Sequence, residues 1–577
     1  MIDFPARTAA RLRVSLVTAL AVSLLGLSPA RAAHGARPPP DAQGIVSAAL
    51  EALGGLAPLR EAGGMVIRTE GSFDLATRLQ GRSPSRPEPT KIAETITVDF
   101  DNGRLAYDVE WSNYKFSRQS LREIYDAEGR VLYIDKRARS GGWPPIAIVP
   151  DAALRYQRIL PQIMLADALE NRVTLLNKGE SRFAGEPVDV IGFVTSAGDP
   201  LTLYINRRDK RLTGAAHTFD MELLGDAEIR WEWSDYADDA RLVAPGRLRV
   251  FLDGALLKDV RLSVEPGTGS ESFAAPDGIE AGEPPPLAEL PSFADFTPYS
   301  KRPGQAREVA PRVYLAPGVR PGFHMFFVEF DEFVLAVDAP TGWYEMQQIP
   351  PYDFDRSEGT SDLAEKYIRT IKATVPGKPI RYVALTHHHS DHIGGVRAFI
   401  AEGATVLAGE AAAAAARTAA DRPHTLWPDR LADSDATARI EVVRDTRTIS
   451  DGEMEVELIE LPADNPKADG FLVVHLPKHR IMYFTSFIYP LPEASFPAPE
   501  SVPLSLWFVR WLDQSGLEPE QLFNVHGQAR VQDWQLEYFR ELLRNGAPVA
   551  GEGGERVRDA PPAMGVRPPQ SGTQKLP

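Results

Sequence analysis

Residues 386–395 read THHHSDHIGG, and this stretch concentrates side chains that bind metal ions. In an extended segment His387 and His389 are two positions apart and face one side, while Asp391 and His392 follow as the chain turns. The chain has no cysteine, so any metal site must use imidazole, carboxylate or other nitrogen and oxygen ligands. The spacing predicts a metal site. The alternative is a solvated polar loop with a chance run of histidines.

The elements around this stretch place it where active sites commonly form. Residues 380–386 (IRYVALT) have the pattern of a buried strand, and a helix is expected from about Gly395 to Glu402. Gly394 and Gly395 permit a tight turn between them. Another helix is expected near residues 361–375, so strands alternate with helices here as in α/β domains. Sites in such folds gather at the carboxyl ends of strands.

These residues resemble the HxHxDH motif of the metallo-β-lactamase fold superfamily. The resemblance extends over residues 306–546 and includes the stretches RAFIAEGATVLAG, DGFLVVHLP and VHG. It implies an α+β fold, an αββα sandwich, whose cleft holds one or two metal ions, usually zinc, with a metal-bound hydroxide as nucleophile. Such an ion lowers the pKa of its bound water toward neutrality.

The resemblance assigns the ligands position by position. His387 and His389 match the first metal site, whereas Asp391 and His392 match the second. His526, in FNVHGQA, matches the last ligand of the second site, and Asp391 is the residue to which a catalytic role is assigned. Three protein ligands plus water is the usual set for a catalytic zinc, so the second site keeps a sufficient number.

Two positions depart from the family pattern. Lys467, in NPKADG, stands where a histidine is typical, and Ser486, in TSFIYP, stands where the metal-bridging aspartate is typical. A protonated lysine has no lone pair, and at about 4 Å with an effective dielectric constant near 20 it would repel a divalent ion by roughly 8 kcal/mol. Serine removes the negative charge that holds two cations together. The sequence therefore predicts a degenerate active site with one zinc ion or none.

Other arrangements stay open at this point. A neutral Lys467 could ligate a metal, and a carboxylated one could bridge two ions. Asp464 or Asp469 could turn inward, although turn formation is the simpler interpretation. The remaining histidines are expected at the surface or behind the ligands, with no assigned role: His388, His424, His475 and His479.

The start of the chain has the layout of a secretory signal peptide. Arg7, Arg11 and Arg13 precede the apolar run at residues 14–27, and small residues follow at Ala30, Ala32 and Ala33. The run is shorter than the roughly twenty residues that span a bilayer, so we expect cleavage, not a stable membrane anchor. This pattern predicts a periplasmic or secreted protein.

At 577 residues the chain is long enough for more than one domain. After a signal peptide at 1–33, residues 40–280 alternate apolar and polar positions and predict a curved antiparallel sheet with one or two helices. This β-rich domain resembles lipoprotein-carrier half-barrels loosely; it could hold an apolar ligand or shield the cleft. A proline-rich linker is expected at 281–305, the metallo-β-lactamase-like domain at 306–546, and a disordered tail at 547–577.

Three stretches carry the strand prediction, and one carries a helix prediction. The strands are TITVDF (95–100), RLAYDVEW (104–111) and RVLYIDK (130–136), with a tight turn at 101–103. Residues 151–171 have helical spacing, with Asp151 as the expected N-cap.

The composition limits the partners. A formal net charge of -16 provides no basic excess to replace counterions along phosphates, so we expect no nucleic-acid partner and a small-molecule substrate instead. The leading hypothesis is an exported metal-dependent hydrolase of an ester, amide, lactone or phosphodiester. The alternative is a non-catalytic binding protein, a pseudoenzyme that keeps the fold but has lost metal chemistry, with Lys467 in the vacated first site.

Overall fold

The computed structural model describes residues 41–549 with several gaps. The gaps are 75–89, 115–116, 128–129, 137–139, 143–156, 196–197, 238–241, 269–272, 280–281, 285, 287–303, 318, 320–322, 342–361, 492–496 and 498–500. The predicted signal peptide, the N-cap Asp151, most of the predicted linker and nearly all of the predicted tail lie outside the described residues. Within them, no helix is long and apolar enough to cross a membrane.

A 13-stranded antiparallel sheet dominates the N-terminal part and confirms the predicted β-rich domain. Its strand order is β6-β5-β4-β3-β2-β1-β13-β12-β11-β10-β9-β8-β7, so every pairing joins sequence neighbours except that of β1 with β13, and β6 and β7 form the two edges. The strands are β1 (Gly64–Phe73), β2 (Thr90–Asp99), β3 (Arg104–Tyr114), β4 (Ser117–Tyr125), β5 (Val131–Asp135), β6 (Ser140–Gly142), β7 (Leu176–Phe183), β8 (Glu186–Val194), β9 (Pro200–Asn206), β10 (Leu212–Met221), β11 (Gly225–Tyr236), β12 (Pro245–Leu252) and β13 (Ala255–Pro266).

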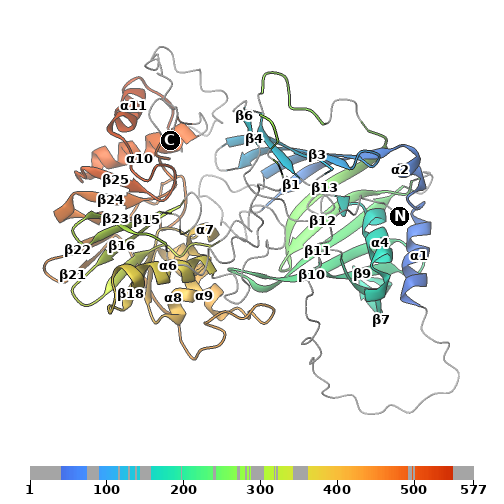
Figure 1. Cartoon of the computed structure of the whole chain (residues 1–577), viewed down its shortest axis with the longest axis horizontal. Coiled ribbons are helices and arrows are strands. Elements are labelled where there is room, and N and C mark those ends of the chain that lie inside the picture. Colours follow the sequence, from blue (N-terminus) through green and yellow to red (C-terminus); the bar gives the residue numbers. More distant parts are fainter. Residues whose placement is uncertain are drawn as a thin grey trace.

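Along strands such as β12, alternate side chains enter one apolar core, whereas strands such as β8 are buried along most of their length. The helices α1 (Ala42–Ala52), α2 (Ala57–Glu61) and α4 (Pro161–Glu170) supply apolar residues to the same core. Figure 1 shows α1 and α4 side by side against the strands. The predicted turn after β2 is present, and Gly103 has a φ of 62° there.

The helix predicted over residues 151–171 is partly wrong. Residues 151–156 lie outside the described residues, and the chain leaves the helical conformation at residues 158–160. Helix α4 then begins at Pro161, with Leu160 as its N-cap and no side-chain capping bond. Proline fits the first turn of a helix but lacks the N–H that an interior position donates. The chain therefore restarts helix at Pro161 and does not continue one through it.

Two further sheets form the C-terminal part. One has seven strands in chain order: β14 (Arg307–Ala310), β15 (Val313–Pro317), β16 (His324–Glu329), β17 (Val334–Val337), β18 (Ile380–Leu385), β19 (Thr405–Ala408) and β20 (Arg439–Val442). The other has five: β21 (Thr446–Ser450), β22 (Glu455–Glu460), β23 (Leu472–Leu476), β24 (Ile481–Phe484) and β25 (Gln521–Asn524). Strands β17 to β20 run parallel, as do β24 and β25.

The two sheets pack face to face between layers of helix, which is the αββα sandwich that the sequence predicts. One core joins the seven-stranded sheet to the inner face of the five-stranded sheet, where Phe326 stacks on Tyr483 with ring centroids 4.7 Å apart. A second core lies between the five-stranded sheet and its own helices. The helices are α6 (Asp362–Thr374), α7 (Ser390–Ile393), α8 (Val396–Ala401), α9 (Glu410–Asp421), α10 (Val502–Ser515) and α11 (Asp533–Arg544), and short 3-10 turns lie at Arg172–Thr174 and Pro477–His479.

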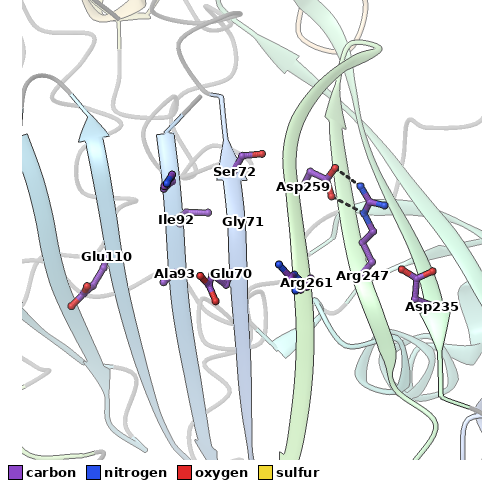
Figure 2. Close-up of a pocket in the computed structure, with 11 residues that line it drawn as sticks. Glu70, Gly71, Ser72, Ile92, Ala93, Glu110, Asp235, Arg247, Asp259 and Arg261 are labelled. Atoms are coloured by element: carbon purple, nitrogen blue, oxygen red, sulfur yellow. Dashed lines mark hydrogen bonds and ion pairs between the residues drawn. The ribbon is translucent and has the colours of Figure 1, made fainter. Parts of the chain in front are cut away.

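A pocket of about 750 Å³ lies on the N-terminal sheet (Figure 2). Its lining comes from β1, β2, β3, β11, β12 and β13 and is largely ionic, as in the pair of Arg247 and Asp259, 2.6 Å apart. An apolar ligand requires an apolar lining. We therefore assign this pocket no ligand.

Candidate metal centre

The histidine-rich stretch leaves the carboxyl end of β18 and immediately forms one helical turn. His389 has an extended backbone and precedes α7, so Asp391 and His392 lie on a helical turn that sequence patterns did not predict. The backbone N–H of Thr386 donates to Asp338 Oδ1 over 2.7 Å, which fixes the start of the stretch. The order of elements therefore brings the motif to the edge shared by β17 and β18.

Asp338 orients one of the candidate ligands, and sequence reasoning missed it. The distance between His392 Nδ1 and Asp338 Oδ2 is 2.9 Å, and both side chains are fully buried. A carboxylate on one ring nitrogen leaves the other, Nε2, available for a metal ion. Asp338 also has a φ of 60°, an uncommon conformation that often marks functional sites. The available signal was an acidic residue directly after the buried strand FVLAV.

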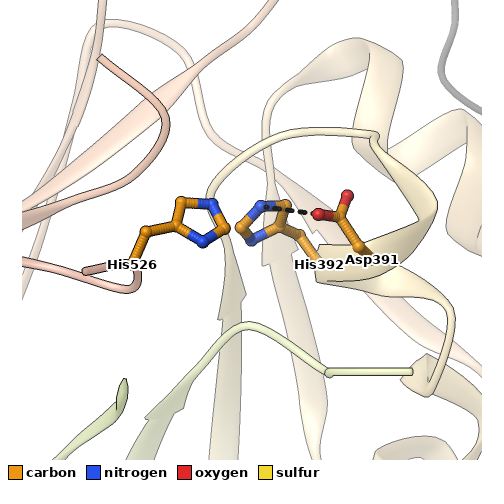
Figure 3. Close-up of side chains that lie close together, drawn as sticks. All are labelled: Asp391, His392 and His526. Atoms are coloured by element: carbon orange, nitrogen blue, oxygen red, sulfur yellow. Dashed lines mark ion pairs between the residues drawn. The ribbon is translucent and has the colours of Figure 1, made fainter. Parts of the chain in front are cut away.

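Three candidate ligands meet around one small volume (Figure 3). One ligand atom from each of Asp391, His392 and His526 lies within 4.8 Å of the others. The distance between His392 Nε2 and Asp391 Oδ2 is 3.6 Å. His526 follows the end of β25 and lies 134 residues after His392 in the sequence. Two imidazoles and a carboxylate, with a water molecule as fourth ligand, are a donor set suited to a catalytic zinc. The residues present therefore fit one divalent ion.

Aromatic rings flank His526 at this edge. Phe323 meets it edge-on with ring centroids 4.8 Å apart, and Tyr489 stacks on it at 5.0 Å. The backbone N–H of His526 donates to Asn524 Oδ1 over 2.8 Å. Tyr489 is 40% exposed, so its ring borders the solvent side of the centre.

His387 and His389 lie beside this group without completing a second one. The His387 ring centroid is 4.4 Å from those of both His389 and His392, and its ring stacks on Phe471. Burial, followed by the nearby His389, lowers the pKa of His387 well below its ordinary value. Its Nε2 is buried without a hydrogen-bond partner among the described residues. The lowered pKa favours the neutral imidazole of His387, which is the form that can bind a metal ion.

Lys467 and Ser486 occupy the two substituted positions in this region. Lys467 is 5% exposed, and its charge is among the causes that lower the pKa of His387. Ser486 is 3% exposed, and its Oγ lies 3.2 Å from Thr485 Oγ1, which in turn lies 3.4 Å from His392 Nε2. Within the described part of the chain, the only group of three or more close acidic or imidazole ligands is Asp391, His392 and His526. Asp464 and Asp469 are exposed and lie outside that group.

The other histidines are placed differently from one another. His388 is 9% exposed next to His389, and His479 is half-buried at a 3-10 turn. His475 is buried and pairs with Glu457 over 2.8 Å. His424 is fully buried and lies 2.6 Å from Asp220 of the N-terminal sheet. A surface position for His424 is therefore wrong, because its partner comes from another part of the chain that spacing could not reveal.

Comparison with known proteins agrees with this fold. Residues 359–524 match the family described as the metallo-beta-lactamase superfamily. The match identifies a metallo-beta-lactamase domain in this part of the chain. A search of curated proteins found no match.

Solved structures of the same fold are distant in sequence. A B3 metallo-beta-lactamase with an active-site glutamic acid is 18% identical, over 44% of this chain and 94% of its own, with a TM-score of 0.29. A metallo-beta-lactamase from Pontibacter korlensis is 17% identical, over 42% of this chain and 99% of its own, with a TM-score of 0.28. The FIM-1 metallo-beta-lactamase from Pseudomonas aeruginosa, solved in a mono-zinc form, is 17% identical, over 42% of this chain and 96% of its own, with a TM-score of 0.28.

Proposed function

We propose that this protein is a metal-dependent hydrolase that holds one zinc ion with Asp391, His392 and His526. The observation that carries the proposal is the convergence of those three ligand atoms within 4.8 Å of one another. The superfamily match supports the hydrolase class. The substrate is a small molecule with an ester, amide, lactone or phosphodiester bond.

The residues of the centre have separate roles in this proposal. When bound, a divalent ion supplies Lewis-acid polarisation and lowers the pKa of a coordinated water molecule. Asp338 holds His392 through Nδ1, so Nε2 keeps its direction toward the ligand group. His387 is neutral and lines the buried side, where it can accept or donate one hydrogen bond to substrate.

Lys467 gives the centre a fixed positive charge in place of a second ion. Its burial beside His387 keeps that charge poorly screened by water. A second divalent ion at the His387 side would meet this charge and would lack the bridging carboxylate that Ser486 replaces. We therefore propose one metal ion per chain, not two.

The test is hydrolysis by the purified full-length chain. Nitrophenyl esters, a lactone and a nitrophenyl phosphodiester serve as reporters, before and after removal of metal by a chelator and after addition of zinc. Turnover of at least one reporter that disappears with chelation and returns with zinc supports the proposal. His392→Ala and His526→Ala should abolish it, whereas His475→Ala, which changes a buried histidine outside the ligand group, should not.

A protein that binds no zinc and hydrolyses none of the reporters would contradict the proposal and favour a binding protein instead. Zinc binding by both His392→Ala and the parent with equal affinity would also contradict it, because the ion would then sit elsewhere.

We also propose that the chain is exported to the periplasm or beyond. The support is the arginine-flanked apolar run at residues 14–27 and the small residues that follow it. Sequencing the amino terminus of the mature protein should give a start at about residue 33 or 34. Intact protein retained in the cytoplasm would contradict export.

A further inference from the structure

The hairpin of β10 and β11 reaches out of the N-terminal sheet and enters the C-terminal domain. Figure 1 shows this hairpin extending toward the region of α7 and α9. The tip consists of residues 222–224, between the paired Met221 and Gly225. Leu223 is 5% exposed and belongs to the apolar core of the C-terminal sandwich, although it lies far from that domain in sequence. The tip is therefore a shared part of both domains.

Hydrogen bonds to residues 423–426 hold this tip in one position. The backbone N–H of Asp226 donates to Pro423 O over 2.8 Å, and the Asp226 carboxylate accepts from the backbone N–H groups of Thr425 and Leu426 over 2.9 and 3.1 Å. A Cβ added to Gly225 would lie 2.1 Å from Pro423 O. Because both the backbone and the side chain of Asp226 are hydrogen-bonded to residues 423–426, the hairpin tip has little freedom to shift along that segment.

Glu222, at the tip, contacts the segment that follows β17. Thr341 Oγ1 donates to Glu222 Oε1 over 3.0 Å, and the two residues are 0% and 1% exposed, respectively. A buried carboxylate loses favourable hydration, so it is stable only where hydrogen bonds replace water. The glutamate and threonine therefore depend on each other across the two domains.

Thr341 belongs to a segment that is joined to the metal-binding loop. The backbone N–H of Ala339 donates to His392 O over 2.6 Å, and that of Gly395 donates to Ala339 O over 3.0 Å. The Thr341 side chain fills the space beside Gly394, where an added Cβ would lie 2.6 Å from Thr341 Cγ2. Residues 338–341 therefore fix both the His392 ring, through Asp338, and the backbone that carries it.

We propose that Glu222 is a positioning residue for the metal centre, supplied by the N-terminal domain and acting through Thr341. This inference rests on the proposed function and adds a requirement to it. The ligand group is held in its geometry only when the hairpin tip is seated. The N-terminal domain is thus part of the metal centre's support and more than a cover for it.

The experiment compares variants of the full-length chain that change the same interface at different distances from the centre. Glu222→Ala and Thr341→Val each remove one side of the hydrogen bond, and Glu222→Gln keeps an oxygen that accepts it. Asp253→Ala is the matched control, because it removes an interdomain ion pair with Arg422 that includes neither Glu222 nor any of residues 338–341.

Two measurements distinguish a positioning role of Glu222 from a general loss of stability at the interdomain interface. The first is zinc affinity, measured by competition with a chromogenic chelator. The second is hydrogen exchange of the peptide spanning residues 384–396 in metal-free protein. Glu222→Ala and Thr341→Val should each weaken zinc binding by about tenfold and speed exchange in that peptide. The double variant should lose no more than either alone, and Glu222→Gln and Asp253→Ala should stay near the parent.

Zinc affinity and loop exchange that match the parent in Glu222→Ala would overturn the inference, as would equal losses in Asp253→Ala. If the parent binds no zinc, the proposed function fails and loop exchange alone decides the inference. If Glu222→Ala does not fold, the comparison of Thr341→Val with Thr341→Ser decides it, since serine keeps the hydroxyl donor. Equal zinc affinity and loop exchange in those two variants would overturn the inference.

Discussion

At the residue scale, the pair of His392 and Asp338 makes the sharpest prediction. Replacing Asp338 with alanine leaves His392 Nδ1 without its buried carboxylate, so the ring loses its fixed orientation. Changes of this kind typically weaken metal binding by about 10- to 100-fold. We expect that loss in zinc affinity for Asp338→Ala, measured by chelator competition.

The matched control is Glu457→Ala. Glu457 on β22 lies 2.8 Å from His475 on β23, and neither residue belongs to the ligand group, so this variant removes a carboxylate from a histidine that is not a proposed ligand. Equal zinc affinity in the parent and Asp338→Ala would show that His392 does not need its partner, or that it is not a ligand.

A second prediction concerns the two substituted ligand positions. Lys467→His with Ser486→Asp removes a positive charge and adds a negative one beside His387 and His389, which should create a second zinc site. Ser486 has a φ of 63°, a conformation that aspartate tolerates better than most residues. Each change alone should add less than half of a second ion, because the two act together.

Elemental analysis of the parent, both single variants and the double variant measures this directly. A double variant with no more zinc than the parent would show that the cleft has rearranged beyond these two residues. A parent that already holds two ions would point to ligation by a neutral or carboxylated Lys467.

The sequence revealed the ligands better than their supports. His392 and His526 could be matched because a motif and chain order mark them, and the structure brings them together with Asp391. Asp338 could not be matched, because its role depends on β17 lying parallel to β18 in register, which one sequence does not specify. Glu222 could not be predicted either, because its partner Thr341 lies 119 residues away in sequence and in another domain.

At the element scale, the turn from α7 into α8 depends on close packing at Gly394. A Cβ there would lie 2.6 Å from Thr341 Cγ2 and 2.7 Å from Ser390 O. Gly394→Ala should therefore lower the free energy of unfolding by about 1–3 kcal/mol through overpacking. Urea unfolding of the full-length chain measures it.

Gly44→Ala is the control for this change. Gly44 lies within α1 and an added Cβ there meets nothing within 4 Å, so the substitution should be neutral or stabilise by up to about 1 kcal/mol. A Gly394→Ala variant as stable as the parent would mean that the loop can shift without cost.

Hydrophobic periodicity predicted most helices and strands correctly. It was least reliable where a proline or a single helical turn sets the ends of an element. Alternation located β2, β3 and β5 within a few residues, because one face of each strand is buried. One continuous helix over residues 151–171 was predicted because the spacing is helical on both sides of Pro161, but the chain turns at residues 158–160 before α4 begins. The single turn α7 was not predicted, since four residues carry no periodic pattern.

At the scale of the whole molecule, the two domains share a polar interface that includes Asp226 and should respond to acid. Burial opposes ionisation of Asp226, but hydrogen bonds from Thr425 and Leu426 outweigh it and lower its pKa below the ordinary value of 3.8. Its stabilising contribution is therefore present above that value and is lost as pH falls through the lower, folded-state pKa.

Asp226→Asn removes this contribution. At pH 7 it should lower stability by about 1 kcal/mol, a modest value because the site is only partly buried. The difference from the parent should shrink as pH falls below about 3.8. Burial raises the pKa of Asp220 despite its bond to His424, so that carboxylate has the opposite sign of pH dependence. Thermal unfolding at several pH values gives the comparison; a difference that grows in acid would contradict it.

The most direct test of the central claim is the zinc content of the purified full-length protein after dialysis against zinc-replete buffer, compared with that of Asp391→Ala and His526→Ala. We expect about one zinc per chain in the parent and a clear loss in both variants, because Asp391, His392 and His526 form the proposed site. A parent without zinc, or variants that retain it fully, would show that these three residues do not hold the ion.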